Sequence, residues 1–220
     1  MKKLFYLLCS LLTVTLVSCD NSKEPSDPAN GHEYVDLGLS VKWATCNVGA
    51  NSPEESGNYF AWGETSPKSE YNNSTYKWRG VEYGTYTKYC TLSSEGTVDN
   101  KTILDLSDDA AHVNWGGSWR MPNAAEINEL YVNCIWEWDI KNGVEGYTVI
   151  GPNGNSIFLP SAGYVYGKDL IFGGNVGLYA TSSLSPLDTG SFACLYFESG
   201  GPGININSRV VGNCIRPVLP

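Results

Sequence analysis

Few residues of this chain have types and spacing that could do chemistry. Histidine occurs only at positions 32 and 112, and nothing around His112 has the Gly-x-Ser-x-Gly pattern of a nucleophile elbow. No Cys-x-x-Cys or His-x-x-x-His spacing suggests zinc. Glu64, Glu126 and Asp139 could supply the two carboxylates of a glycosidase, but no motif singles them out. The sequence therefore favours a non-catalytic protein, with an enzyme of oxidase or glycosidase type as the alternative.

The chemistry that the first residues favour is lipidation of Cys19. Met1-Lys2-Lys3 is a short positive start, and the apolar stretch at 4–17 is too short to span a bilayer comfortably. Ser18 places a small residue directly before Cys19. We interpret residues 1–18 as a lipoprotein signal peptide and Cys19 as the acylated first residue of the mature chain. The alternative is an ordinary signal peptide with an incidental cysteine.

Residues 19–31 are predicted to form the lipidated cysteine and a flexible tether. Residues 20–31 are polar, with two prolines and no large apolar side chain, so they cannot bury enough surface to order themselves. Acidic residues close behind Cys19 resemble the surface-export signals of Bacteroidetes lipoproteins. That implies an outer-membrane protein facing the cell exterior, with retention at the inner leaflet as the alternative. Residues 32–220 are expected to form a single domain.

The charge balance limits the classes of partner. The chain holds 14 Lys and Arg and 23 Asp and Glu residues. Removal of Lys2 and Lys3 with the signal peptide leaves 12 basic residues against 23 acidic ones, a net charge of −11. This excess of negative charge argues against nucleic acid and anionic membrane surfaces as partners. We therefore expect contact with the membrane only through the lipid anchor.

Five cysteines remain in the mature chain besides Cys19. Because five is odd, at least one thiol lacks an intrachain partner. Two disulfides and a set of buried free thiols are both compatible with the sequence, which does not assign any pairing. The five are Cys46, Cys90, Cys134, Cys194 and Cys214.

The element that must organise the domain is a helix predicted over 124–134. Asn123 can cap its free backbone N–H groups, and Glu126 can reach back to close a capping box. Directly before it, Trp119 is expected in the core, and Arg120 is expected to pair with a buried carboxylate. A second, short helix is predicted over 108–114, capped by Ser107.

Short strands account for most of the remaining regular structure. Residues 63–103 are rich in Ser, Thr, Tyr and Asn without periodicity, and we expect a long excursion with one hairpin. All seven tryptophans lie between Trp43 and Trp138. Most are expected to be buried, with Trp136 and Trp138 as candidates for an exposed, sugar-stacking role on different sides of the chain. Strands are predicted at 34–37, 40–45, 58–62, 147–150, 156–159, 163–166, 170–172, 178–182, 192–197 and 214–218. Two modest helices with many short antiparallel strands indicate an α+β fold.

Several segments carry a resemblance to a known family. Residues 119–126, Trp-Arg-Met-Pro-Asn-Ala-Ala-Glu, resemble a segment shared by the Fibrobacter succinogenes major paralogous domain family, and a shorter version occurs in the formylglycine-generating enzyme family. Residues 34–50, 59–65, 151–160 and 215–218 agree with the first family in order. The resemblance covers roughly residues 31–220 and implies a C-type lectin-like fold with two short helices, small antiparallel sheets and long loops. It does not imply one function, because a fold hosts many functions.

The resemblance also bears on cofactors. Many C-type lectins bind sugar through calcium, with triplets such as Glu-Pro-Asn. The nearest triplets here, at 121–123 and 151–153, lack the carboxylate. Asp105, Asp108 and Asp109 do not have the spacing of an EF-hand loop. The reactive cysteine pair of formylglycine-generating enzymes is also not matched, because Cys194 and Cys214 lie far apart in the sequence. We expect neither a metal nor another cofactor.

The candidate binding residues lie where the chain departs from its relatives. Relatives tend to carry aromatic residues in a strand that here reads Tyr179-Ala180-Thr181, and in the last segment, which here has no aromatic between 198 and 214. We predict a displayed, ligand-binding tract beyond the glycines of that segment. The alternative is a hairpin in which Ile and Asn simply alternate in and out of a sheet. The predicted ligand-binding residues are Tyr179, Ala180, Ile204, Asn205, Ile206, Asn207, Ser208 and Arg209.

Three functions remain open. The first is a surface-anchored module that binds an extracellular glycan, protein or peptide. The second is the variable protein of a diversity-generating retroelement, since such elements often use the C-type lectin-like fold. Every residue from 199 to 214 can be reached from an AAC codon by changing only its adenines, which is consistent with that reading. The third is the oxidase- or glycosidase-type enzyme.

Overall fold

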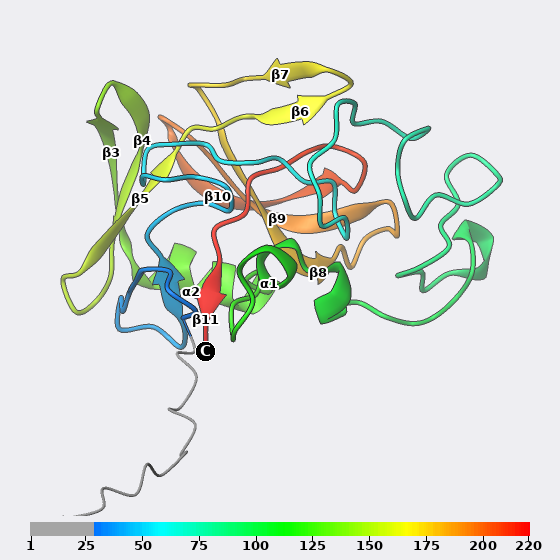
Figure 1. Ribbon diagram of the computed structural model, residues 1–220, viewed down its shortest axis with the longest axis horizontal. Helices are drawn as coiled ribbons and strands as arrows, with labels where there is room; N and C mark the ends of the chain where they lie inside the picture. The colour runs from blue at the N-terminus through cyan, green and yellow to red at the C-terminus, as the bar shows by residue number, and fades with distance from the viewer. Residues whose placement is uncertain (1–28) are drawn as a thin grey trace, which may run out of the picture.

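Figure 1 shows the computed structural model of the chain, which describes residues 29–220. Within these residues, two α-helices accompany small antiparallel sheets, which confirms the α+β class. The expected signal peptide at 1–18, the lipidated Cys19 and the tether up to residue 28 lie outside the described residues. No helix of the described part is long and apolar enough to cross a membrane. The helices are α1 (Ala110–Trp115) and α2 (Ala124–Asn133), with short 3-10 helices at Ser93–Glu95 and Leu106–Asp108.

Four sheets carry the strands of residues 29–220, and neighbours within each sheet are antiparallel. The beginning and the end of the domain pair in the first sheet, so Figure 1 shows the C-terminus beside the blue N-terminal segment. In spatial order, the sheets are β1 (Tyr34–Val35), β2 (Lys42–Ala44) and β11 (Val218–Leu219); β3 (Ile135–Lys141), β4 (Val144–Ile150) and β5 (Ser156–Pro160); β10 (Gly201–Ser208), β9 (Ser191–Glu198) and β8 (Gly177–Leu184); and the hairpin β6 (Tyr164–Tyr166) and β7 (Asp169–Ile171).

Strand β8 runs through the middle of the core, and all eight of its residues are buried. Leu178 and Ala180 belong to one apolar cluster, which also contains Trp119. Tyr179 belongs to a second cluster, which contains Ile127 of α2. Successive side chains of a strand point to opposite faces, so β8 is covered on both sides. Because both faces of β8 are buried, residues 178–182 do not alternate between apolar and charged side chains.

The predicted helix start is confirmed in detail. The Asn123 side chain accepts from the N–H of Glu126, and the Glu126 carboxylate accepts from the N–H of Asn123, which completes the capping box. The carboxylate that pairs with Arg120 is that of the same Glu126, reached by two hydrogen bonds of 2.7 and 2.6 Å. Trp119 is fully buried, as expected. One carboxylate therefore caps α2 and also fixes the cation in front of it.

The first helix differs from its prediction at its start. Asp109, not Ser107, caps α1, and its carboxylate accepts from the N–H of His112. The same carboxylate accepts from the N–H of Met121, 2.8 Å away. Ser107 lies instead inside the 3-10 helix that precedes α1. The Asp109 carboxylate therefore caps α1 and also binds the segment that leads into α2.

Strand β3 is absent from the predictions, although its signal is present. Residues 135–141 alternate, and Asn142-Gly143 forms the two-residue turn to β4 with φ values of 50° and 82°. Trp136 and Trp138 lie on the same face of β3, because residues two apart in a strand do, and both rings pack against Tyr147. The expectation that they point to different sides is therefore wrong. Conversely, 58–62 and 214–217 form no strand; within them only Phe60 and Cys214 make isolated bridges.

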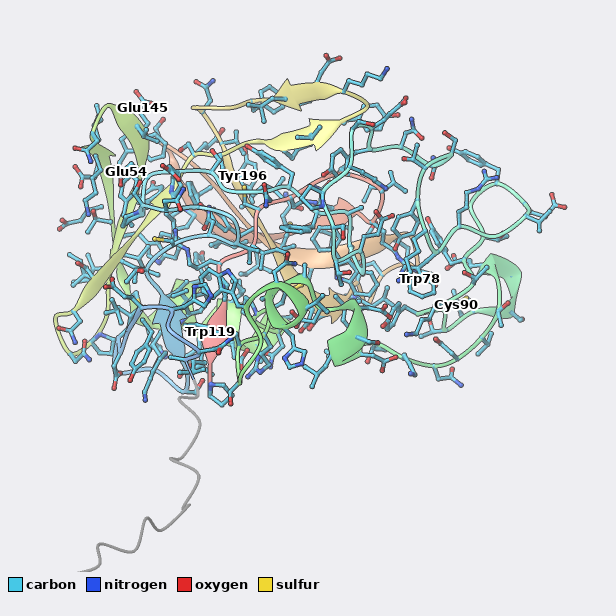
Figure 2. All side chains as sticks on the ribbon, in the orientation of Figure 1. Glu54, Trp78, Cys90, Trp119, Glu145 and Tyr196 are labelled. Atoms are coloured by element: carbon cyan, nitrogen blue, oxygen red, sulfur yellow. The ribbon has the colours of Figure 1, made fainter. Side chains whose placement is uncertain are left out.

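The excursion of residues 63–103 contains no strand and extends to one end of the molecule. Figure 2 shows Trp78 and Cys90 at this end, with Glu54 and Glu145 at the other. The expected hairpin is reduced to a bridge between Arg79 and Tyr86. Two carboxylates, the half-buried Asp99 and the buried Asp108, hold the segment. Asp99 accepts from the backbone N–H groups of Tyr89, Cys90 and Lys101, and Asp108 accepts from the Tyr89 hydroxyl and pairs with Lys77 and Lys88.

The folded part begins earlier than expected. Ala29 is buried, and its carbonyl accepts from the indole N–H of Trp119. Asn30 donates to the carbonyl of Trp115, and the His32 ring stacks on the Trp115 ring at 3.9 Å. Residues 29 and 30, which were predicted as part of the tether, therefore already contact the domain.

Candidate ligand-binding site

A groove lies where strand β10 meets the start of α2 and the loop between β8 and β9. Its volume is about 420 Å³, and its lining is mainly apolar. Ile204, Asn205 and Ile206 form one wall, so the structure brings three of the predicted binding residues to one concave surface. Leu187 forms part of the opposite wall and has 77% of its surface exposed. The lining residues are Ala124, Pro186, Leu187, Ala193, Ile204, Asn205 and Ile206.

The hairpin of β9 and β10 positions this wall. Ser199 and Gly200 make the connection, and the register places Ile204 opposite Leu195 and Ile206 opposite Ala193. Directly paired residues share one face of a sheet. Leu195 and Ala193 are buried, whereas Ile204 and Ile206 keep 42% and 37% of their surface exposed. The observed geometry is therefore the predicted alternative, a hairpin in which Ile and Asn alternate between the two faces of a sheet. Both isoleucines lie at the outer edge of this sheet.

Strand β10 is an edge strand, and its own asparagines cover part of that edge. In this register the N–H groups of residues 204, 206 and 208 point away from β9. The Asn205 side chain accepts from the N–H of Ile206 at 2.8 Å, and the Asn207 side chain accepts from the N–H of Ser208 at 2.9 Å. Two donors that would pair with an additional strand are thus already occupied.

Arg209 corrects the prediction of a displayed tract. Its side chain is fully buried, so it is not a displayed binding residue. The guanidinium donates to the Tyr76 hydroxyl and to the carbonyls of Lys88, Tyr89 and Thr189, at 2.9 to 3.2 Å. Aromatic rings complete its surroundings; the Tyr86 ring centroid is 4.4 Å away. Neutral oxygens and aromatic rings thus surround the cation in place of a carboxylate. Because these partners come from segments distant in sequence, the position of Arg209 next to an exposed strand suggested, wrongly, that its side chain is exposed.

Tyr179 and Ala180 are also corrected. Both lie on the fully buried β8, with 1% and 2% of their surface exposed, and neither can reach a ligand. The Tyr179 hydroxyl donates to the carbonyl of Pro160 at 2.9 Å, and burial raises the pKa of this phenol. Asn207 is half-buried and donates to Asn213, and Ser208 is exposed beyond the groove. Of the predicted tract, only residues 204–206 therefore line the groove.

The remaining walls of the groove were missed by sequence reasoning. Ala124 and Ala193 carry no signal, since alanine is common both in cores and on surfaces. Pro186-Leu187 carries no distinct signal either, since a single exposed apolar residue is common on protein surfaces.

The carboxylates considered for glycoside hydrolysis all have structural partners. Glu64 pairs with Lys68 at 2.9 Å and accepts from the N–H of Lys77. Glu126 caps α2, and Asp139 accepts from the N–H of Ile140 and from a threonine hydroxyl. Within residues 29–220, no group of three or more His, Cys, Asp and Glu side chains is placed to hold a metal ion.

All five cysteines of the described part are free thiols, so the two-disulfide alternative is wrong. Cys90, Cys194 and Cys214 are buried. Burial raises the pKa of Cys194 and of Cys214 to about 12, and that of Cys134 to about 11.

A scan against protein-family models and searches of curated proteins and of solved structures found no match to this chain.

Proposed function

We propose that this protein is a non-catalytic lipoprotein, anchored to the outer membrane through Cys19 and facing the cell exterior, that binds an extracellular ligand. The sequence resemblance to the Fibrobacter succinogenes major paralogous domain family supports a C-type lectin-like fold. The two short helices, the small antiparallel sheets, the paired terminal strands and the long excursion are compatible with it.

The groove is the observation that carries the proposal. It is concave, and it coincides with the tract at 204–206 that departs from the family pattern. An apolar lining with one polar amide favours an apolar or aromatic side chain of a protein or peptide over a saccharide, whose hydroxyls would lose hydrogen bonds to water there. Among the ligands left open by the sequence, we therefore place a protein or peptide in this groove.

Burial bears on the retroelement alternative. Such a mechanism diversifies surface positions that a stable scaffold displays. Residues 209–214 are all buried here, and Arg209 is central to the packing of the excursion. Diversification across 199–214 would therefore damage the core, which leaves the invariant binding module as the preferred function. A near-identical DNA repeat differing at adenines beside the coding region would reverse this preference.

Binding by the groove can be tested with the purified full chain in detergent on an array of extracellular proteins. Leu187→Asp and Ile206→Asp place a charge in the apolar groove and should weaken binding at least tenfold, which corresponds to about 1.4 kcal/mol. Leu170→Asp is the matched control, because Leu170 is 55% exposed on β7 and does not line the groove. Unchanged binding by both groove variants would show that the ligand binds elsewhere.

The anchor is tested separately. Cys19→Ala removes the thiol that would carry the lipid, so the protein should move from the membrane fraction to the soluble fraction. Protease treatment of whole cells tests the exterior location. Retention of Cys19→Ala in the membrane would contradict the lipoprotein assignment, and full protection from protease would place the domain in the periplasm.

A further inference from the structure

A second concave surface lies on the excursion, away from the groove. The loop of residues 79–86 encloses a cup of about 130 Å³, which shares no lining residue with the groove. Tyr83 lines the cup with 89% of its surface exposed. Beside it lie the side chains of Asn73, Arg79 and Glu82. An aromatic ring this exposed is unusual in a domain that buries most of its large aromatics.

The base of this loop is firmly held. The N–H of Gly80 donates to the carbonyl of Thr85 at 2.6 Å. Tyr86 exchanges backbone hydrogen bonds with Glu95 and Thr97 at 2.8 and 2.9 Å, and its ring lies against the buried Arg209. The exposed tip is therefore carried on an anchored base, so a ligand would meet a shape that is largely formed in advance.

The polar side chains around the cup are unused by the fold. Asn73, Arg79 and Glu82 make no side-chain hydrogen bond or ion pair within the described residues, although a basic and an acidic side chain line the same cup. In the rest of the excursion, by contrast, Lys77, Lys88 and Lys101 are paired with Asp105 or Asp108. The cup thus offers free donors and free acceptors beside an exposed ring.

This chemistry selects one class of ligand. The guanidinium offers only donors, the carboxylate only acceptors and the carboxamide both. A phosphate would be repelled by Glu82, a cation would be repelled by Arg79, and an apolar side chain would desolvate all three polar groups. Neighbouring hydroxyls of a sugar both donate and accept, and the C–H face of the sugar ring can pack on the Tyr83 ring. We propose that the 79–86 loop is a binding site for a neutral saccharide, independent of the groove.

The test uses the full chain in detergent and affinity electrophoresis through gels that contain mannan, dextran, laminarin or xyloglucan. Polygalacturonate and heparin gels form the anionic arm. At least one neutral polysaccharide should retard the wild type. Tyr83→Ala should weaken that interaction about tenfold, in line with the loss of an aromatic contact. Tyr166→Ala, which removes an exposed tyrosine from β6, should bind as the wild type does.

Glu82→Gln is the second variant, because it keeps the shape of the side chain and removes its charge. It should weaken binding to the neutral polysaccharide, and its melting temperature should equal that of the wild type because the Glu82 side chain has no partner within the described residues. If Tyr83→Ala melts at a lower temperature, Glu82→Gln alone decides. Retardation by the anionic gels only, the absence of retardation in all neutral gels, or equal binding by the deciding variant would overturn the proposal.

Discussion

At the scale of single residues, two buried arginines bind neutral oxygens in place of the carboxylates that usually accompany a buried cation. Arg209 binds four oxygens of neutral groups, and Arg216 binds Asn47 and the carbonyls of Ala44 and Thr45. Neither has a carboxylate partner within the described residues. Each guanidinium instead fixes carbonyls from segments far apart in the sequence, which rigid, divergent donors do better than a single ammonium group.

The first prediction concerns Arg209. Arg209→Lys keeps the charge but cannot reach all four oxygens, so buried carbonyls lose their donors. The free energy of unfolding should fall on the order of 3 kcal/mol. Urea denaturation measures the change, with Arg79→Lys as an exposed control that should match the parent. A parental midpoint for Arg209→Lys would mean that the charge alone, and not the hydrogen-bond geometry, holds the excursion.

The second prediction concerns Asp108 and pH. Burial of Asp108 opposes its ionisation, but hydrogen bonds from Lys88, Tyr89 and Lys77 outweigh this and hold its pKa below the ordinary value of 3.8. The stabilisation is therefore present at neutral pH and is lost as the pH falls below 3.8 through the lowered pKa. Asp108→Asn should cost about 2 kcal/mol at pH 7.

The difference between Asp108→Asn and the parent should shrink as the pH falls through that window, when followed by urea denaturation at a series of pH values. Asp169→Asn, at an exposed position of β7, is the control and should follow the parent throughout. A difference that stays constant down to the lowest pH would contradict an ionised, stabilising Asp108.

At the scale of elements, the sequence predicts what is locally encoded. The capping box defines α2, and turn residues define the β4–β5 unit. Strand β3 was equally predictable from its alternation and its Asn-Gly turn. The excursion was not, because Asp99, Asp108 and Arg209 hold it through contacts between residues distant in sequence. The groove was half predicted: 204–206 stood out by contrast with the family, but their partners come from another loop and another helix.

The third prediction separates the two roles of Glu126. Asn123→Ala removes the cap and should cost about 1 kcal/mol. Arg120→Ala should also cost only about 1 kcal/mol, since the Arg120 side chain is 26% exposed. Glu126→Gln can still accept from the N–H of Asn123 and should cost less than Asn123→Ala. Urea denaturation ranks the three, and a larger loss for Glu126→Gln than for Asn123→Ala would make the ion pair, and not the cap, the main determinant.

The fourth prediction concerns the outer edge of β10. Asn205→Ala combined with Asn207→Ala frees the N–H groups of Ile206 and Ser208, so the edge can pair with that of a second copy. Light scattering should detect dimers or larger species for this variant at concentrations where the parent is monomeric. Asn175→Ala, an exposed asparagine outside the sheets, should stay monomeric. A monomeric double variant would show that the asparagine side chains do not protect the edge.

At the scale of the whole molecule, the fold is closed by packing and not by covalent links. Every thiol of the described part is free, and the terminal strands β1, β2 and β11 pair beside the core. The fifth prediction follows: excess dithiothreitol should leave the melting temperature unchanged, while a disulfide-bonded protein heated in parallel should melt lower. A drop for this protein would reveal a disulfide in the purified chain.

The contacts that residues 29–32 make with Trp115 and Trp119 have a mechanical consequence. Any pull on the chain that precedes residue 29 enters the domain through the Ala29 carbonyl on the Trp119 indole, the Asn30 contact and the stack of His32 on Trp115. Strand β1, which follows these contacts in the chain, is only two residues long. The load is therefore borne first by the contacts with Trp115 of α1 and with Trp119, and only then by the two residue pairs of a short strand. Because Ala29, Trp115 and Trp119 belong to one buried apolar cluster, such a pull would reach the core at its first contacts.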